Sequence, residues 1–357
     1  MSYEFIHLIK YLPIMKRILF FLAAAAAMTA CSQDETTDLA GKGPGIDFRA
    51  ALTRATETTT DNLQKIVVTA LDASQANYFT DVEFTKSGSF FTSADPYYWP
   101  SDGSSLTFHA YAPTAAELGG TVTIDQNTKQ LADYAPASDI TAQQDFITAT
   151  ATGSKTNAAT GVALTFSHRL AQIEIKAKSD NDTYIYKVQG IRIAQPVSKA
   201  TFDFGTTQWT PGAEKANYDV TYEGSERTLT GTAATLMAAD GNNAMLIPQQ
   251  LVAWDPTGDA SNTKKGAYLA VKINITTKEG TQIYPEQDGG YGWAAVAIDT
   301  NWEAGKKYVY TLDFTNGAGK VDPEDPDNPG EDILGSPIKF TVTVDEWQDA
   351  AAEDVEM

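Results

Sequence analysis

The sequence has very few of the residues that build disulfides, metal sites and most enzyme active sites. Its 357 residues include one cysteine, Cys31, and three histidines that stand far apart. A single cysteine excludes an intramolecular disulfide and a cysteine-based zinc site. The residue spacings of zinc proteases, hydrolase nucleophiles and nucleotide-binding loops are also missing from the sequence. We therefore expect a protein that is not an enzyme and that has no catalytic residues, no metal and no cofactor.

Basic clusters are scarce as well. The formal net charge is −20, and 42% of the residues are apolar. Because phosphate groups are bound by clustered Lys and Arg, we do not expect nucleic acid as a partner. The apolar share is large enough to form buried cores, and the length is most simply divided into two domains.

The longest apolar run stands near the start of the chain, at residues 18–28, and follows Lys16 and Arg17. Eleven residues are too few to span a bilayer but suit the apolar region of a secretory signal. The run leads into "MTAC", which resembles a bacterial lipobox. This resemblance implies a signal peptide over 1–30 and a lipid on Cys31 that holds the protein at the outer membrane. The alternative is an ordinary secretory signal with a chance cysteine.

Apolar and polar residues alternate through much of the remaining chain, a pattern typical of strands with one buried face. No long segment has the 3.6-residue period of a helix. We therefore expect an all-β protein with β-sandwich domains at 55–156 and 157–357, which meet in the polar run 152–161. The clearest alternations lie at 66–70, 106–110, 162–166, 269–275, 308–314 and 338–344.

The segment "GPGIDFRAALTRATETTTDN", residues 43–62, predicts a strand beside an accessible segment. Apolar residues fill every second position from 46 to 52, the alternation ends at Arg54, and a threonine-rich run follows. Such polar runs are where proteases cut most readily. The plain alternative is an ordinary first strand with Arg54 in solvent. The alternating residues are Ile46, Phe48, Ala50 and Leu52.

The segment "VALTFSHRLAQIEIKA" changes the phase of its alternation between Leu170 and Ile173, which predicts a bulge or a corner. His168 has the inward phase, and we interpret it as a buried histidine near that corner, because no nucleophile stands beside it.

Two other clusters leave binding functions open. Tyr97, Tyr98 and Trp99 could stack on sugars or could cover the edge of a sandwich. The acidic, proline-rich segment 319–337 could bind calcium or could be an extended exposed loop. Its candidate calcium ligands are Asp322, Asp325 and Asp327.

Taken in order, several motifs resemble the fimbrillin-like family, the subunits of type V pili in Bacteroidales. The resemblance runs over nearly the full chain. The motifs are the lipobox at Cys31, "IDFRAALTRAT" (46–56), "YYWPSDGSSLTFHAYAP" (97–113), "LTFSHRLAQIEI" (164–175), "MLIPQQL" (245–251), "WEAGKKYVYTLDF" (302–314) and "IKFTVTVDEW" (338–347).

This resemblance implies two transthyretin-like β-sandwich domains in tandem, preceded by a lipidated tether, 31–54, that contains a removable first strand. It also implies that an Arg-specific protease cuts between Arg54 and Ala55. A strand from another pilus subunit would then fill the groove that the first strand leaves, by β-strand addition.

The closing alternation either completes its own domain or serves as a donor strand. Since only an acidic tail follows it, we expect a tip or accessory subunit of a surface fimbrium, with a host or bacterial surface ligand as a further possible partner. The alternative is a monomeric surface lipoprotein that binds glycans. The alternating residues of the closing strand are Ile338, Phe340, Val342 and Val344.

Overall fold

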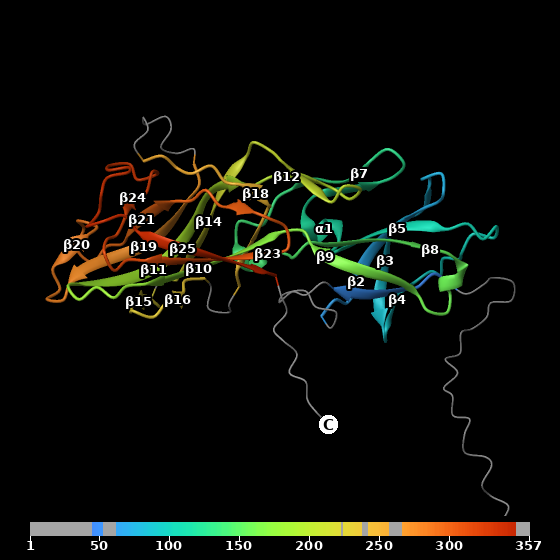
Figure 1. Ribbon diagram of the computed structural model, residues 1–357, viewed down its shortest axis with the longest axis horizontal. Coiled ribbons are helices and arrows are strands. Elements are labelled where there is room, and N and C mark those ends of the chain that lie inside the picture. The colour runs from blue at the N-terminus through green and yellow to red at the C-terminus, as the bar shows by residue number, and fades with distance from the viewer. Residues whose placement is uncertain (1–44, 53–61, 223, 238–241, 257–265, 348–357) are drawn as a thin grey trace, which may run out of the picture. The chain divides into compact units, whose positions relative to one another are not determined.

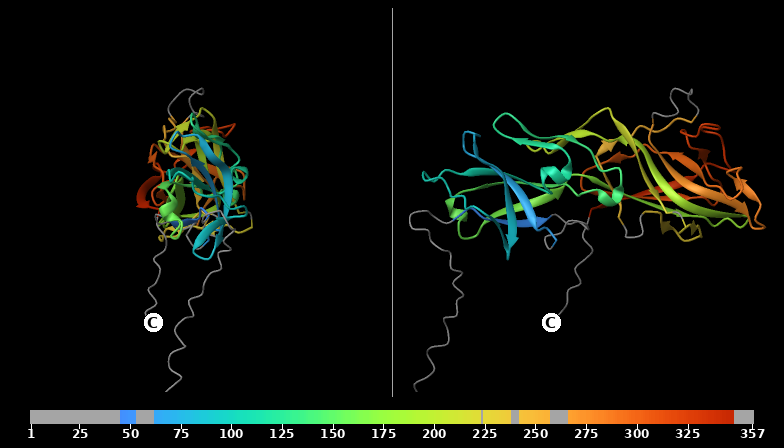
Figure 2. Two further views of the ribbon diagram at one scale, coloured as in Figure 1. Left: turned by 90° about the vertical axis from the view of Figure 1, so that its right-hand side faces the viewer. Right: turned by 180° about the vertical axis from the view of Figure 1, so that it is seen from behind.

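Strands dominate the computed structural model, which describes residues 45–52, 62–222, 224–237, 242–256 and 266–347 (Figures 1 and 2). Its one α-helix within these ranges, α1 (Ala115–Leu118), is a single turn, so the all-β prediction is confirmed. No helix in the described ranges is long and apolar enough to cross a membrane.

The first part of the described chain forms a closed barrel, with the strand order β1-β4-β3-β2-β5-β8-β9. Its interior is rich in aromatic rings, among them Phe84 and Phe108, and the predicted alternation at 66–70 points inward. The strands are β1 (Phe48–Leu52), β2 (Lys65–Leu71), β3 (Asn77–Ser87), β4 (Phe90–Ser93), β5 (Leu106–Ala112), β8 (Ile147–Gly153) and β9 (Val162–His168).

Two further sheets face each other across a second core. One has the order β16-β10-β23-β25, with β17 also on β10; the other has the order β14-β11-β19-β21-β24, with β15 on β11 and β20 on β19. The apolar sides of β19 and β23 are buried, as their alternation predicts. The strands are β10 (Ala171–Lys178), β11 (Tyr184–Val197), β14 (Lys215–Thr221), β15 (Arg227–Thr228), β16 (Ala234–Thr235), β17 (Ala244–Leu246), β19 (Tyr268–Thr277), β20 (Gln282–Tyr284), β21 (Gly292–Ala297), β23 (Lys306–Asp313), β24 (Lys320–Val321) and β25 (Lys339–Glu346).

A smaller sheet joins the two halves of the sequence. Its order is β13-β12-β7-β6, so a hairpin from before residue 157 pairs with a hairpin from after it. A two-stranded ladder of β18 and β22 lies apart from it. The strands are β6 (Thr121–Ile124), β7 (Lys129–Tyr134), β12 (Ala200–Asp203), β13 (Gln208–Pro211), β18 (Gln249–Gln250) and β22 (Asn301–Trp302).

The strand pairing does not divide the chain at residue 157. The polar run 152–161 connects β8 to β9, and both strands belong to the barrel. The change of sheet comes later, between His168 at the end of β9 and Ala171 at the start of β10. This is the corner that the phase change predicts, because a chain that passes from one sheet to another must present a different side to its new core.

Candidate functional site

The first strand, β1, completes the barrel between β4 and β9. It runs parallel to β9 over five residue pairs, from Phe48 opposite Val162 to Leu52 opposite Phe166. On its other side it meets β4 at only one pair, Phe48 opposite Phe91. Most of its ladder therefore depends on a strand that lies more than a hundred residues later in the sequence.

Phe48 is the main apolar contact that β1 makes with the barrel. Its side chain is fully buried, and its ring meets Phe84 edge-on at 4.8 Å and Phe108 at 5.0 Å. Ile46, just before the strand, is 1% exposed, and its N–H donates to the carbonyl of Tyr97 at 2.7 Å. The predicted inward side of the first strand is thus buried at Ile46 and Phe48, whereas Ala50 is half-buried.

Several residues of the sequence-based hypothesis lie outside the described ranges. These are Cys31, Arg54 and Ala55. The backbone of Leu52 belongs to β1, but its side chain is outside the description as well. Lipidation and cleavage at these residues stay predictions.

The walls of the groove that holds β1 could not be found from the sequence. Phe84, Phe91, Phe108 and Phe166 are each buried, and they come from four different strands. The alternations at 106–110 and 162–166 predict that Phe108 and Phe166 are core residues. No sequence signal says which strands lie beside Phe48, because that depends on how the strands are ordered in the barrel.

The closing strand, β25, is an edge strand of its sheet. All eight of its residues pair with β23, from Lys339 opposite Asp313 to Glu346 opposite Lys306. Burial falls along its apolar side: Ile338 is buried, Phe340 and Val342 are half-buried, and Val344 is 51% exposed. The beginning of the strand, near Ile338, therefore covers the second core more than its end near Val344 does.

The aromatic cluster at 97–99 packs mostly into the barrel. Trp99 is buried, and its ring meets Phe108 edge-on at 5.9 Å. Tyr97 contacts the ring of Phe79 at 4.6 Å, and Tyr98 is half-buried. The cluster thus packs against the barrel core, which favours a structural role, as in the edge-covering interpretation, over a platform for sugars.

The acidic segment 319–337 is attached to the second sandwich by a buried carboxylate. Asp322 accepts a hydrogen bond from the Tyr268 hydroxyl at 2.9 Å and forms an ion pair with Arg192 at 3.1 Å. Burial raises the pKa of Asp322 above its usual value. Asp325 accepts from two backbone N–H groups of its own turn, including that of Asp327.

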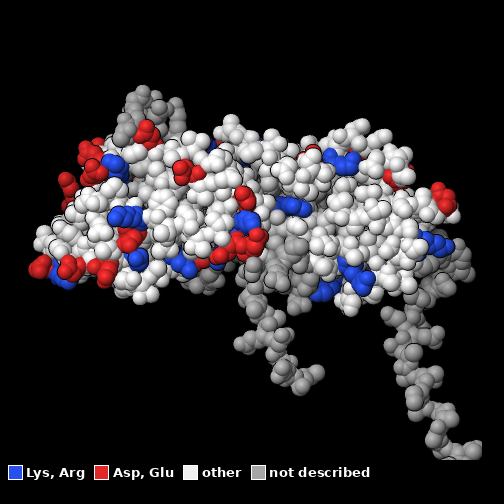
Figure 3. All heavy atoms as spheres, viewed as in Figure 1, with Lys and Arg blue, Asp and Glu red and all other residues white. Residues whose placement is uncertain are grey.

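The carboxylates of Asp322 and Asp325 thus have protein partners. The described residues contain no cluster of three side chains that could hold a metal ion. Figure 3 shows acidic side chains gathered at the end of the second sandwich that carries β24 (Lys320–Val321). Lys and Arg side chains are interspersed along the same face. The segment is a loop that folds back on itself, with Lys320 bridged to Asp332 and with Val321 and Asp322 buried, and it is therefore not the extended exposed loop of the sequence interpretation.

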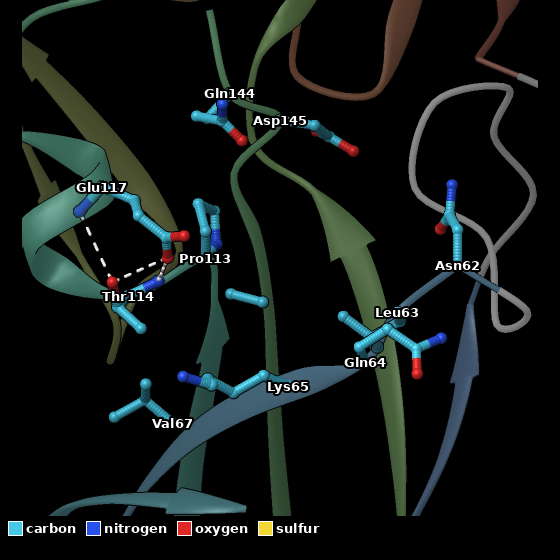
Figure 4. A pocket seen from close by; sticks show the side chains of 11 residues that line it. Asn62, Leu63, Gln64, Lys65, Val67, Pro113, Thr114, Glu117, Gln144 and Asp145 are labelled. Carbon is cyan, nitrogen blue, oxygen red and sulfur yellow. Dashed lines mark hydrogen bonds between the residues drawn. The ribbon is translucent and has the colours of Figure 1, made fainter. Parts of the chain in front are cut away.

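His168 is buried, as its phase predicts, and lies beside a buried acid. Its Nδ1 is 2.8 Å from Oδ2 of Asp145, the distance of an ion pair, although the two groups are not aligned for a hydrogen bond. Asp145 also borders a cavity of about 370 Å³ at the end of the barrel where β2 begins and β5 ends (Figure 4). The other charged groups of this cavity are engaged, because Lys65 pairs with Glu83 and Glu117 accepts from Thr114.

Comparisons with known proteins agree with the architecture. A family model described as fimbrillin-like matches residues 53–347, and the chain therefore belongs to the fimbrillin-like family. It is 24% identical to the fimbrium subunit Fim1C of Phocaeicola vulgatus, over 86% of this chain and 94% of that protein.

Two solved structures share the fold. A fimbrial protein from Bacteroides vulgatus is 17% identical, with a TM-score of 0.58 over 84% of this chain and 99% of that chain. A protein described as a cell adhesion protein from Parabacteroides distasonis is 10% identical, with a TM-score of 0.50 over 87% of this chain and 99% of that chain. At these identities the likeness concerns the fold alone.

Proposed function

We propose that this chain is a structural and adhesive subunit of a cell-surface fimbrium and that it is exported as a lipoprotein through Cys31. Membership of the fimbrillin-like family supports the fimbrial role. The short apolar run before "MTAC" supports the lipid anchor. One acyl chain holds a membrane only marginally, so a durable attachment to the outer membrane needs more than one chain.

The subunit is assembled by strand exchange after an Arg-specific protease cuts between Arg54 and Ala55. The observation that carries this proposal is that Phe48 of β1, and Ile46 just before it, are buried in a groove made by other strands, shortly before the cleavage site in the sequence. Burying two such side chains contributes roughly 3–6 kcal/mol before ordering costs. Another subunit could gain the same free energy of burial by adding one of its strands in place of β1.

Cleavage changes which strand fills the groove. While the chain is intact, β1 is held beside its groove at an effective concentration on the order of millimolar, so strands of neighbouring subunits compete poorly. Once the connection is cut, β1 can dissociate and a donor strand can take its place. An intact chain would also avoid an open apolar edge, which would aggregate during export.

The closing strand supports a tip or accessory position. All eight residues of β25 pair with β23 of the same chain, which supports a strand that completes its own sandwich. A strand used in this way within its own sandwich is not free to enter the groove of a neighbour.

The test uses a labelled synthetic peptide that spans residues 45–54. The full chain is treated with an Arg-specific protease, washed free of its own first strand and mixed with the peptide. We expect the cut chain to bind the peptide, and the uncut chain not to. The variant Arg54→Lys, which keeps the charge but resists the protease, should behave like the uncut chain.

A peptide with Phe48→Asp is the matched control, and it should fail to bind because a charge cannot enter the aromatic groove. Equal binding by cut and uncut chains, or equal binding of both peptides, would overturn strand exchange at this groove. If the cut chain polymerised with itself, the tip assignment would be wrong and the chain would be a shaft subunit.

A further inference from the structure

Trp347, the residue after β25, is buried although the strand before it is mostly exposed. Its side chain is 2% exposed, whereas that of Val344 in β25 is 51% exposed. The backbone N–H of Trp347 donates to the carbonyl of Gly305 at 3.0 Å. Trp347 therefore holds the end of the closing strand in place, where the side chains of the strand itself are mostly exposed.

The indole of Trp347 packs in a different core from the rest of β25. Phe340 and Val342 pack against the core of the second sandwich. Trp347 instead belongs to the cluster that includes Val67 on β2 and Tyr111 on β5, two barrel strands. The end of the closing strand thus packs in a core that combines barrel residues with residues of later segments, such as Met245 and Ile247.

The surface that receives the indole is the ring of His168. The two rings stack with centroids 4.6 Å apart and planes 25° from parallel. On its edge the imidazole meets Asp145 at 2.8 Å, and the side chains of both residues are at most 4% exposed. The imidazole thus contacts the indole with its face and lies close to the carboxylate of Asp145 with its Nδ1.

The contact is apolar stacking without a hydrogen bond from the indole. The Nε1–H of Trp347 has no acceptor among the described residues. A buried donor without an acceptor costs free energy that water would recover on exposure, so the indole is held less firmly than its burial alone suggests. Such a contact can be opened without disrupting a hydrogen-bond network.

We propose that Trp347 is a latch: its indole, seated on His168, holds the end of the edge strand β25 on its sandwich and ties that strand to the barrel. When the indole leaves His168, β25 can separate from β23 while the rest of the sandwich stays folded. This goes beyond the proposed strand exchange and does not depend on it, because the latch acts within one uncut chain.

Hydrogen exchange of the full, uncut chain tests the latch. In Trp347→Ala we expect the amides of β25 to exchange about ten-fold faster or more, with the amides of β11 and β19 nearly unchanged. Free indole, which can occupy the space left by the side chain but is not joined to β25, should not slow this exchange; restoration by free indole would show that Trp347 only fills a cavity. His168→Ala should accelerate the same amides, and the double variant should add little, because both changes remove one contact.

Trp209→Ala is the matched control. Trp209 is a second indole packed against the same apolar cluster, but its ring contacts are Tyr134 and Phe202, and its Nε1–H donates to the carbonyl of Arg169 at 2.6 Å. The control should leave the exchange of β25 unchanged. The latch is overturned if Trp347→Ala leaves β25 within about two-fold of wild type, if it accelerates or unfolds all strands alike, or if Trp209→Ala accelerates β25 as much.

Discussion

Phe48 meets two aromatic rings edge-on, and its side chain is fully enclosed by the barrel. Edge-to-face ring pairs add to the free energy that burial of area supplies. The neighbouring residue Arg49 points outward and is exposed. Adjacent positions of β1 thus differ sharply in what they contribute to the barrel.

We expect Phe48→Ala to lower the free energy of unfolding by about 3–5 kcal/mol in the uncut chain, because it leaves a cavity between Phe84 and Phe108. Arg49→Ala should change it by no more than about 0.5 kcal/mol. Urea unfolding with a shared m-value measures both. A Phe48→Ala chain as stable as Arg49→Ala would show that β1 contributes little to the barrel.

At the scale of elements, β25 differs from the other long strands in its burial. It has a partner on one side only, and its apolar residues become more exposed toward the chain end. The matching strand β23 lies between two partners, and its alternate side chains are buried. An edge strand with this profile can either close its own sheet or leave it.

Phe340→Asp distinguishes these roles. If β25 closes the sandwich, the charge faces the half-buried ring environment near Tyr310 and the melting temperature should fall by several degrees, which corresponds to about 1–3 kcal/mol. Thr341→Asp, on the exposed side of the same strand, should have little effect. Equal melting of the two variants, with Phe340→Asp alone failing to join cut subunits, would identify β25 as a donor.

Strands with regular alternation can be predicted from the sequence. Which strands lie beside them in a sheet cannot be predicted in this way. The segments 269–275 and 308–314 proved to be buried strands because their pattern reflects one face and needs no knowledge of the partner. The longest strand, β11, was not predicted, since a bulge between Val188 and Gly190 and a positive φ at Gln195 interrupt its alternation.

At the scale of the whole molecule, the two halves of the described chain share a sheet. The hairpin of β6 and β7 pairs with the hairpin of β12 and β13 through contacts such as Leu131 opposite Phe202. Because these pairs link residues across position 157, neither half has a complete set of strands by itself. The polar run 152–161 predicts a loop, but its polarity does not say which sheets the loop connects. The loop lies within the barrel and not between two domains.

We therefore expect one cooperative thermal transition in place of two. Calorimetry of the full chain should give a van't Hoff enthalpy close to the calorimetric enthalpy. Phe202→Ala, in the shared sheet, should shift the whole transition, since Phe202 is fully buried there. Two resolved transitions, with only one of them moved by Phe202→Ala, would instead support independent domains.

The parallel pairing of β1 with β9 has a consequence for how a fimbrium would be organised. A strand that replaced β1 in the same pairing would enter with one fixed direction, so the giving and receiving surfaces of each contact would differ. Contacts of this head-to-tail kind generate filaments with two unlike ends. A subunit that receives but does not give would then occur once, at one end. The number of its copies would set how many filaments a cell makes, and the supply of other subunits would set how long they grow.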